Sequence, residues 1–565
     1  MSGTAWVRRS VDEGLLAPLL AAGALPVLAR VLAARGAVAE DLGEPDLAGL
    51  LPFGQLKGID AAAGLLADAI EAGRRLLIVA DYDADGATAC AVGLRALRAM
   101  GAHVDYLVPN RLTLGYGLTP EVVRLALPRQ PQLIVTVDNG IASVAGVAEA
   151  NRLGIPVLVT DHHLPGSELP DAAAIVNPNQ PGCLFPSKCM AGVGVMFYVM
   201  MALRAELRRR GRWQNQAEPA LGSLLDLVAL GTVADVVRLD RNNRLLVQAG
   251  IRRIAAGRAV SGIRALYRVA ERPESAARSA DLGFVLGPRL NAAGRMEDMT
   301  HGIECLVSDD PGEALRHAQR LDAFNRERRE VESAMQADAL ERLDAFDVSG
   351  RYTLCLHDAG WHPGVVGILA SRLKDRYHRP VIVFAAGTDE DEIRGSGRSI
   401  AGFHLRDALD QVTKRDPALI RRFGGHAAAA GLTLRRADLG RFESAFEAVA
   451  RECLSPSDLA EQVIHDGEPE EAEMTLQVAQ ALQARVWGQG FPEPLFQGRF
   501  AVVQQRVVGQ RHLKLKLRRQ ERLFDAILFG QAEALPEEVE LLYHLGVNEW
   551  QGLRQVQLEV RHWRV

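Results

Sequence analysis

The sequence has few cysteines and no arrangement that would use them together. Six cysteines are spread over 565 residues, and none forms a Cys-x-x-Cys pair. The two nearest in sequence, Cys183 and Cys189, have no second pair of cysteines or histidines at the spacing of a structural zinc site. Scattered cysteines in a long chain are typical of reduced thiols, so we expect a cytoplasmic protein.

Long apolar runs are missing as well. No run approaches the roughly 18 residues that a membrane-spanning helix requires. The N-terminus also lacks the apolar stretch behind a basic start that marks a secretory signal. We therefore expect no membrane partner. The composition, 48% hydrophobic and 24% charged residues, is that of a globular protein.

An excess of positive charge is also missing. The chain has 65 basic and 70 acidic residues, which gives a net charge of −5 at pH 7. By itself this balance argues against a nucleic-acid-binding protein, because such proteins are often basic overall. However, an acidic metal site in one part of the chain can offset a basic surface in another, so the distribution of charge matters more than its sum.

The sequence does contain a series of apolar runs that predict buried strands. They cover residues 76–80, 133–137 and 155–160 and alternate with helical stretches. This pattern is typical of a parallel sheet covered by helices on both faces, and such sheets bind ligands beyond the carboxyl ends of their strands. The residues that directly follow the three runs are therefore expected at one edge: Asp81, Asp83 and Asp85; Asp138; Asp161, His162 and His163.

The whole chain predicts an α/β protein of three or four domains, judged by its length. Near the C-terminus Leu513, Leu515 and Leu517 alternate with basic residues, which is the period-two pattern of a half-buried strand in a small β-barrel or sheet. The predicted parts are a helical segment (1–70) packed on a parallel-sheet domain (71–240), a helical connector (241–345), a second α/β domain (346–455) and a small β-barrel (467–565).

Closely spaced acids suggest a metal site. Asp81, Asp83 and Asp85 would repel one another if all were ionised, and a divalent cation removes that repulsion. Mg²⁺ and Mn²⁺ bind carboxylate oxygens, and Mn²⁺ also accepts imidazole. An acidic turn is the simpler interpretation of this motif alone. Asp235 lies in an otherwise apolar segment, where an unpaired charge is costly, and a helix N-cap is the simpler explanation for it.

Four motifs occur in order along the chain: Asp-x-Asp-x-Asp-Gly from Asp81, Asp-Asn-Gly from Asp138, Asp-His-His from Asp161 and Ala-Asp-Val-Val around Asp235. Together they resemble the DHH phosphoesterases, and within them the RecJ exonuclease family. The resemblance covers nearly the whole chain. It continues through residues 289–295, 364–367 and 394–399 and through the C-terminal barrel segment. It also includes residues 423–431, which look like the signature of a DHHA1 domain.

The resemblance implies that the parallel-sheet domain (71–240) is a DHH domain, that the second α/β domain (346–455) is a DHHA1 domain, and that the small β-barrel (467–565) is an OB-like domain. It implies a metal-dependent exodeoxyribonuclease that degrades single-stranded DNA in the 5′→3′ direction during recombination and repair. The implied partners are single-stranded DNA, a single-strand-binding protein and a RecQ-type helicase.

The same resemblance implies a role for each residue of the acidic edge. Two Mn²⁺ or Mg²⁺ ions are expected to be held by Asp83, Asp85, Asp138, His162 and Asp235, with Asp138 shared between the ions. Asp81 is expected to be a sixth ligand or a partner of the ligands. Asp161 is expected to orient His162 through a hydrogen bond, and His163 to contact the scissile phosphate and stabilise the leaving oxygen.

Several residues are candidates for DNA contacts. Ser396 and Arg398, on a predicted glycine-rich loop, are expected to bind a 5′-terminal phosphate, since a guanidinium forms paired charge-assisted bonds with phosphate. Gly425 and His426 are expected to lie close to the substrate. For the motif taken alone, a tight turn is a fair explanation of Gly425 and the preceding glycine. Further candidates are Arg111, Arg289, Asn291 and Arg295.

The barrel segment is strongly basic. Residues 499–522 carry eight basic residues and one acid, a local charge of +7. Arg511, Lys514 and Lys516 lie in this segment, with Phe500 and His512 between basic residues, as in an OB-fold that binds a single strand. A barrel that simply faces solvent is the alternative.

Other functions stay open at this point. Smaller DHH proteins resemble oligoribonucleotide or cyclic-dinucleotide phosphodiesterases, but the length and the basic C-terminal segment favour a polymer substrate. A catalytically inactive DHH-like replication factor would lack several ligands, whereas here every expected position holds one. An RNA substrate stays open because contacts to the 2′-hydroxyl cannot be read from a sequence.

Overall fold

The computed structural model describes residues 4–43, 46–110, 116–344, 348, 350–387, 389–550 and 552–565. The chain divides into two compact units. The larger unit contains Arg8–Asp322 and Ile464–Val565, and the smaller unit contains Met1–Val7 and Ala323–Val463. The C-terminal segment thus folds with the first part of the chain. Among the described residues no helix is both long and apolar enough to cross a membrane.

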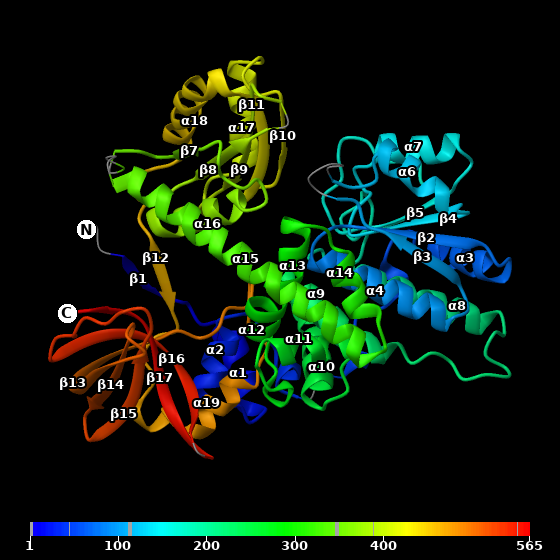
Figure 1. Ribbon diagram of the computed structural model, residues 1–565. Helices are drawn as coiled ribbons and strands as arrows, with labels where there is room; N and C mark the ends of the chain where they lie inside the picture. The colour runs from blue at the N-terminus through cyan, green and yellow to red at the C-terminus, as the bar shows by residue number, and fades with distance from the viewer. Residues whose placement is uncertain are drawn as a thin grey trace. The chain divides into compact units, whose positions relative to one another are not determined.

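The larger unit contains the predicted parallel sheet. Its strand order is β3-β2-β4-β5-β6, and every neighbouring pair is parallel. The helices α6 and α7 cover one face, and α4 and α8 cover the other (Figure 1). The bounds are β2 Arg75–Ala80, β3 His103–Leu107, β4 Leu133–Val137, β5 Val157–Thr160, β6 Ala174–Val176, α4 Ala84–Ala99, α6 Pro120–Ala126, α7 Val144–Arg152 and α8 Gly192–Arg209.

The strand order of this sheet creates a natural ligand site. From β2 the chain passes to β3 on one side and then to β4 on the other. Ligands bind at such a switch in direction, beyond the carboxyl ends of the strands. Asp81 directly follows β2 and Asp138 directly follows β4. The prediction of buried strands that end in acids is therefore confirmed.

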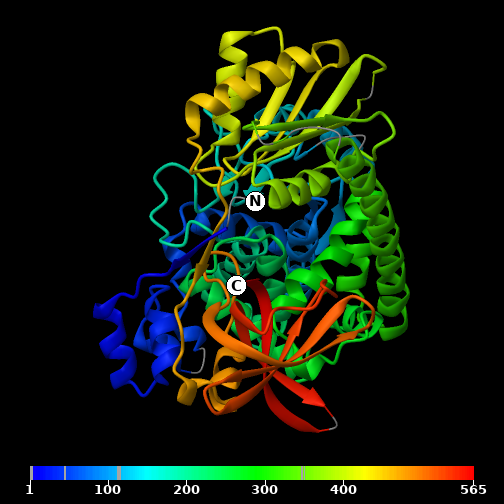
Figure 2. The same cartoon turned by 90° about the vertical axis from the view of Figure 1, so that its left-hand side faces the viewer.

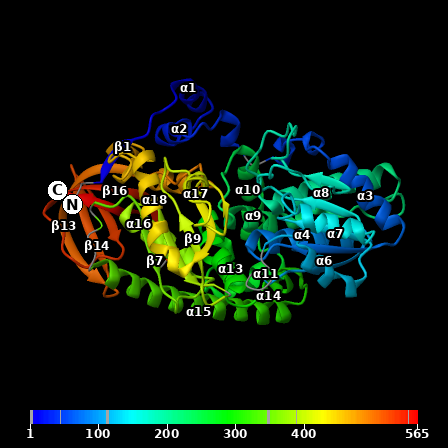
Figure 3. The ribbon, with the colours of Figure 1, turned by 90° about the horizontal axis from the view of Figure 1, so that it is seen from above.

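Helices follow the sheet domain, as predicted. They include the π-helical turn η7 and the long helix α15, which is continuous (Figure 3). The main bounds are α9 Leu225–Ala234, α10 Arg241–Ala255, α11 Ser261–Val269, η7 Leu282–Leu286, α13 Gly287–Met296, α14 Thr300–Val307 and α15 Pro311–Asp344.

The smaller unit contains the second α/β domain. Its sheet has the order β10-β11-β9-β8-β7, with β7 and β8 parallel and the other pairs antiparallel. The helix α16 packs on one face, and α17 and α18 on the other. The bounds are β7 Leu354–His357, β8 Val381–Ala386, β9 Glu392–Arg398, β10 Arg422–Gly425, β11 Ala429–Arg435, α16 Val366–Tyr377, α17 Leu405–Arg415 and α18 Leu439–Cys453.

The prediction of a glycine-rich loop at residues 394–399 is wrong. This segment forms most of β9, the central strand of the sheet. A Cβ atom on Gly395 would lie 2.5 Å from the ring of Phe384, and one on Gly397 would lie 2.7 Å from Leu405. The glycines therefore make room for large core side chains, a use of glycine inside a strand that the sequence pattern does not reveal.

The C-terminal residues form a closed five-stranded barrel in the order β13-β14-β15-β17-β16 (Figure 2). The pair β15–β17 is parallel and the others are antiparallel. The predicted alternation on β14 is confirmed, because its leucines are buried between more exposed basic residues. The bounds are β13 Phe496–Val508, β14 His512–Arg519, β15 Arg522–Leu528, β16 Glu538–Trp550 and β17 Leu553–Arg564.

Phe500 does not belong to the barrel surface, contrary to the sequence prediction. It is 3% exposed and contacts Phe524 and Tyr543 edge to face inside the barrel. Its burial excludes stacking on a nucleobase. Phe529 is an exposed aromatic side chain of this region and lies beside His512.

The N-terminal segment is largely helical, but it begins with the strand β1 (Ala5–Arg8), which pairs with β12 (Gln462–His465). Helix α3 (Ile59–Glu71) packs on the sheet domain through α8 and β6. Helix α2 (Pro26–Ala33) instead approaches the start of the C-terminal segment, where the buried Arg35 forms an ion pair with Asp466.

Candidate active site

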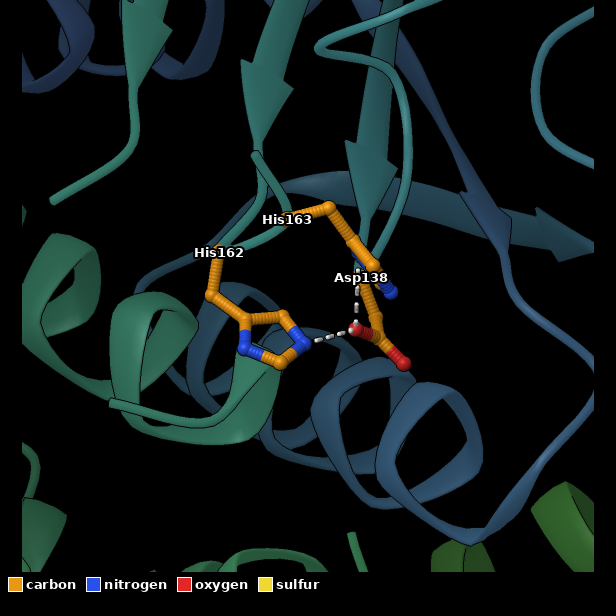
Figure 4. Close-up of side chains that lie close together, drawn as sticks. All are labelled: Asp138, His162 and His163. Atoms are coloured by element: carbon orange, nitrogen blue, oxygen red, sulfur yellow. Dashed lines mark ion pairs between the residues drawn. The ribbon is translucent and has the colours of Figure 1, made fainter. Parts of the chain in front are cut away.

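The carboxyl edge of the parallel sheet brings seven predicted site residues together. Three groups of possible ligand atoms lie within 4.8 Å of one another inside each group. Figure 4 shows part of this cluster, with both imidazoles beside one aspartate. The groups are Asp138, His162 and His163; Asp85, His162 and Asp235; and Asp81, Asp83 and Asp138.

Asp138 occupies a strained turn at the end of β4. Its φ angle is 61°, a left-handed conformation that few residues other than glycine adopt. The side-chain amide of Asn139 holds the turn by donating to the carbonyl oxygens of Val79 and Val137, at 3.1 and 2.9 Å. This turn directs the buried carboxylate of Asp138 into the cluster, where a residue in ordinary strand conformation would not place it.

Two buried atoms of the cluster fit a metal ion. Nε2 of His162 and Oδ1 of Asp138 lie 3.1 Å apart, and neither has a hydrogen-bond partner in the described part of the chain. Burial, reinforced by the charge of His163, lowers the pKa of His162 to about 4. The imidazole is therefore neutral at neutral pH and offers a lone pair. Unsatisfied buried polar atoms are costly, and a divalent cation would satisfy both of these.

Helix N-termini hold two further carboxylates. Asp83 is the N-cap of α4, where Oδ1 accepts from the backbone amides of Asp85 and Gly86. Asp85 accepts from the first amides of α8, those of Gly192 at 2.6 Å and Val193 at 2.8 Å. Burial and the charge of Asp83 nevertheless raise the pKa of Asp85 to about 7. The backbone amides position these two carboxylates but do not remove the repulsion between them. A bound cation would remove it.

Asp235 is not a helix N-cap, so that explanation of its place in an apolar segment is wrong. It lies at the C-terminal end of α9. A carboxylate is disfavoured there because the carbonyl end of a helix carries partial negative charge. Burial and the charges of Asp85 and Asp83 raise its pKa well above the ordinary value. Its Oδ2 lies 3.5 Å from Nε2 of His162, so the position fits a metal ligand.

Asp161 contacts a different histidine from the one predicted. Its Oδ1 accepts from Nδ1 of His163 at 2.7 Å, and it meets His162 only through the backbone amide. The carboxylate therefore orients the ring of His163. Burial alone would lower the pKa of His163, but this hydrogen bond and the charge of Asp161 raise it to about 9. His163 is consequently a protonated hydrogen-bond donor at neutral pH.

Tyr116 belongs to the site and was missed by the sequence analysis. Its hydroxyl lies 3.1 Å from Nδ1 of His163 and donates to the carbonyl oxygen of Asp138 at 3.2 Å. Its ring meets Tyr82 edge to face at 6.2 Å. An aromatic residue between two glycines, Gly115 and Gly117, was the available sequence signal. The predicted contact Arg111 lies outside the described residues.

The segment 289–295 packs against the acidic loop, residues 81–85. Oδ1 of Asn291 accepts from the backbone amide of Ala84 at 2.8 Å. A Cβ atom on Gly294 would lie 1.9 Å from the carbonyl oxygen of Tyr82, so α13 packs directly on the loop. Arg289 is nearly buried and forms an ion pair with Asp322 at 3.0 Å, while Arg295 is half-buried.

The predicted DNA contacts in the smaller unit form two local arrangements. Nη1 of Arg398 donates to Oγ of Ser396 at 3.3 Å on β9, and both lie within 3.1 Å of a Cβ placed on Gly367 in α16. Gly425 has a φ of 140° in the hairpin between β10 and β11, where the amide of His426 donates to Ala429. The tight-turn interpretation therefore explains Gly425, while the exposed His426 keeps its predicted role as a prediction.

The predicted DNA contacts on the barrel differ in exposure. Arg511 is exposed and Lys514 is half-buried. Lys516 forms an ion pair with Asp525 at 3.1 Å across β14 and β15. Two other basic residues of this strongly basic segment, Arg519 and Arg522, bind backbone carbonyls of residues 469–474. Part of the local positive charge thus has a structural use.

Three family models match the chain in the order of its folded parts. They are the DHH family N-terminal domain over residues 75–232, the DHHA1 domain over 349–453 and the RecJ OB domain over 465–562. With the acidic edge described above, they define the protein as a DHH phosphoesterase with a DHHA1 domain.

Similar proteins narrow this class. The chain is 50% identical to the single-stranded-DNA-specific exonucleases RecJ of Salmonella typhimurium and Escherichia coli, over 98% of its length and 97% of theirs. A crystal structure of RecJ from Thermus thermophilus in complex with Mn²⁺ is similar with a TM-score of 0.83 and 31% identity, covering 99% of this chain and 79% of that one. The chain belongs to the RecJ family.

Proposed function

We propose that this protein is a single-stranded-DNA-specific exonuclease that hydrolyses phosphodiester bonds with two divalent metal ions and works in the 5′→3′ direction. The observation that carries the proposal is the convergence of five carboxylates and two imidazoles at one sheet edge. The relatives named above are single-stranded-DNA-specific exonucleases, and structures of the Thermus thermophilus protein contain Mn²⁺ or Mg²⁺.

Two Mn²⁺ or Mg²⁺ ions would be held by residues from four segments of the chain. Bound there, they supply Lewis acidity and lower the pKa of bound water, so that hydrolysis needs no covalent enzyme intermediate. Asp138 and His162 each belong to two of the three groups of ligand atoms, and we assign the central, shared position to Asp138 because its carboxylate would offer two oxygen atoms. The other proposed ligands are Asp83, Asp85, His162 and Asp235, with Asp81 as a further ligand or a partner of the ligands.

His163 acts on the substrate in this proposal. It is protonated at neutral pH, since its pKa is raised to about 9, and a cationic donor forms a strong hydrogen bond with a phosphate oxygen. Asp161 fixes the ring through Nδ1, so we assign Nε2 to the scissile phosphate and the leaving oxygen. The hydroxyl of Tyr116 lies 3.1 Å from the same Nδ1 and also restrains the ring.

The direct test uses end-labelled single-stranded and duplex DNA with and without Mn²⁺. Asp138→Ala and His162→Ala should abolish cleavage while DNA binding stays measurable, because neither change touches the barrel. His103→Ala and Asp171→Ala, at exposed positions of the same domain, are the matched controls and should cleave normally. Undiminished turnover in both Asp138→Ala and His162→Ala would exclude the proposed site. The label also reports polarity, and RNA of the same sequence tests the choice of sugar.

The polarity is proposed to come from recognition of a 5′-terminal phosphate by Ser396 and Arg398. The two side chains lie together on β9, close to the first turn of α16. Wild-type protein should degrade a 5′-phosphorylated strand faster than a 5′-hydroxyl strand. Arg398→Ala should reduce this preference, whereas Arg406→Ala, at an exposed position of the same unit, should not. An unchanged preference in Arg398→Ala would place the phosphate elsewhere.

The remaining expectations are part of the same proposal. They are action in DNA recombination and repair in the cytoplasm, association with a single-strand-binding protein and a RecQ-type helicase, and single-strand contacts through the barrel residues Arg511, Lys514 and Lys516. We also propose the domain boundaries 1–70, 71–240, 241–345, 346–455 and 467–565. Digestion of a long single strand compared with a dinucleotide separates this function from that of a small-substrate DHH phosphodiesterase.

A further inference from the structure

The helical connector carries a basic surface that the proposed mechanism does not use. Residues 252–278 contain seven arginines and two glutamates, a local charge of +5, although the whole chain has a net charge of −5. The arginines are Arg252, Arg253, Arg258, Arg264, Arg268, Arg272 and Arg278.

Helix α11 arranges part of this charge in a row. Its apolar side chains, such as Ile263 and Leu266, are fully buried, so the opposite face is exposed. Arg264 and Arg268 lie on that face one turn apart, and Arg272 follows just beyond the end of the helix. A spacing of four residues corresponds to about 6 Å along a helix. Arg264 and Arg268 are therefore neighbours on this face, and Arg272, which follows the left-handed residue Glu271 (φ 53°), lines the same groove.

These arginines line a groove of about 550 Å³ between α11 and the start of α15. The rest of its lining is mixed: Ala265, Pro273, Pro311 and Leu315 are apolar, whereas Ser261 and Glu274 are polar. Arg264 forms an exposed ion pair with Glu274 at 3.4 Å. Within the described ranges, Arg268 and Arg272 form no ion pair. The charge of Arg272 also acts on the carboxyl group of Asp281. The groove thus combines exposed guanidinium groups, two of them without an ion pair among the described residues, with apolar side chains from the start of α15.

This combination matches the chemistry of a single nucleic-acid strand. Guanidinium groups bind phosphates, and apolar surface accepts the bases and sugars. Arg278 lies further along the chain and lines a separate small hollow with His544 of the barrel strand β16 and with the acidic residues Glu493 and Glu559. The groove and the barrel belong to the same compact unit, which favours a nucleic-acid strand over an acidic protein segment.

We propose that the groove lined by Arg264, Arg268 and Arg272 is a second, non-catalytic binding surface for the backbone of single-stranded DNA. The inference rests on the proposed function, because it takes the substrate of the acidic edge as its ligand. It assigns to the connector a share of the affinity for long strands, in addition to that of the barrel.

The test is the salt dependence of binding to a long single strand in the full-length protein. Each lost phosphate contact reduces the slope of log affinity against log salt by about 0.7 for single strands. The double variant Arg268→Gln with Arg272→Gln should therefore reduce the slope by about 1.4. Replacing both by lysine should restore it. The control variant Arg74→Gln with Arg98→Gln, at exposed positions outside the groove, should keep the wild-type slope.

Two outcomes would overturn the inference. One is a wild-type slope in the double glutamine variant. The other is a double glutamine variant that no longer binds a poly-glutamate peptide, as the wild type does, but binds single-stranded DNA unchanged. That result would assign the groove to an acidic protein partner. Metal-dependent cleavage of a short oligonucleotide should be equal in all variants. Absence of cleavage even in the wild type would contradict the proposed function instead, while the binding slope would still report on the groove.

Discussion

At the scale of single residues, the acidic cluster is an electrostatic problem that the folded chain does not solve alone. Burial and mutual repulsion raise the pKa of Asp138 and Asp235 well above the ordinary value and that of Asp85 to about 7. The helix N-termini that hold Asp83 and Asp85 offset only part of this cost. A bound cation would offset the rest, so metal binding and stability should be linked.

The metal-free protein should therefore become less stable as pH rises. A carboxyl group whose pKa is raised on folding stabilises the fold below its unfolded pKa, and this contribution is lost as pH rises through the folded pKa. For Asp85 the window extends up to about pH 7. Asp138→Asn removes the charge at Oδ1, which has no hydrogen-bond partner in the described structure.

Asp138→Asn should accordingly raise the melting temperature of metal-free protein by at least about 2 °C near pH 8 and have little effect near pH 5. Because the pKa of His162 is lowered to about 4, this histidine makes the folded protein more stable as pH rises. It does so both in the wild type and in Asp138→Asn. Calorimetry in the presence of a chelator measures the difference. An equal shift at both pH values would contradict the linkage.

Asp161→Asn tests the corrected partner of Asp161. The amide would weaken the charge-assisted bond to His163, lower the pKa of this histidine and loosen its ring. Loss of such an orienting partner typically costs 10–100-fold in activity or metal affinity. We expect a fall of about that size in kcat at saturating Mn²⁺. Asp171→Asn, at an exposed position, is the control. An unchanged kcat in Asp161→Asn would remove His163 from the mechanism.

At the scale of secondary-structure elements, the site depends on how closely the helices approach it. Gly192 at the start of α8 lies so near Asp138 that a Cβ there would be 2.7 Å from the aspartate side chain. Gly294 of α13 lies even closer to the backbone of Tyr82, where a Cβ would be 1.9 Å from the carbonyl oxygen. These contacts hold the acidic cluster between two helices that are distant from Asp138 and Tyr82 in the sequence.

Gly294→Ala should therefore disturb the metal site without changing any ligand. The added methyl group cannot fit 1.9 Å from a carbonyl oxygen, so α13 must shift, at a cost of about 1–3 kcal/mol in the free energy of unfolding. The Mn²⁺ concentration for half-maximal activity should rise. Gly64→Ala in α3, where nothing lies within 4 Å, is the control and should be neutral or slightly stabilising. Equal behaviour of the two variants would show that α13 does not support the loop.

At the scale of the whole molecule, the chain termini are part of the architecture. Arg35 and Asp466 are 1% and 3% exposed and are joined by hydrogen bonds of 2.6 and 2.8 Å. Asp466 also accepts from the amide of Leu495, just before the barrel. The N-terminal helices are thereby fastened to the C-terminal segment, so the barrel is not a loosely tethered module.

Asp466→Ala should release this connection. Breaking a buried ion pair by removing one partner costs about 3–5 kcal/mol, because the other charge stays buried. We expect a lower melting temperature and faster proteolysis near residue 466. Asp525→Ala, which removes the partner of the exposed Lys516, should cost less than about 1 kcal/mol. Replacement of both Arg35 and Asp466 by apolar residues should recover much of the loss. Unaltered stability of Asp466→Ala would show that the pair does not hold the barrel.

Local pattern was sufficient for much of the fold and for part of the site. The buried strands that end at Asp81, Asp138 and Asp161, the helical connector and the alternating strand of the barrel follow from hydrophobic periodicity, which depends only on neighbours in the chain. The order of acidic and histidine motifs was sufficient to indicate the family. Parallel strands share one carboxyl edge, and for this reason their terminal residues could be expected to meet.

Tertiary packing alone decided the remaining features. It determined that Asp161 contacts His163, that Asp235 ends a helix, that residues 394–399 form a central strand, that Phe500 is buried, and that Tyr116 joins the site. Each depends on which residues distant in sequence meet across the core, and such contacts leave no periodic trace in the chain. The sequence determined which residues could carry the chemistry, while burial and long-range contact determined their partners and charges.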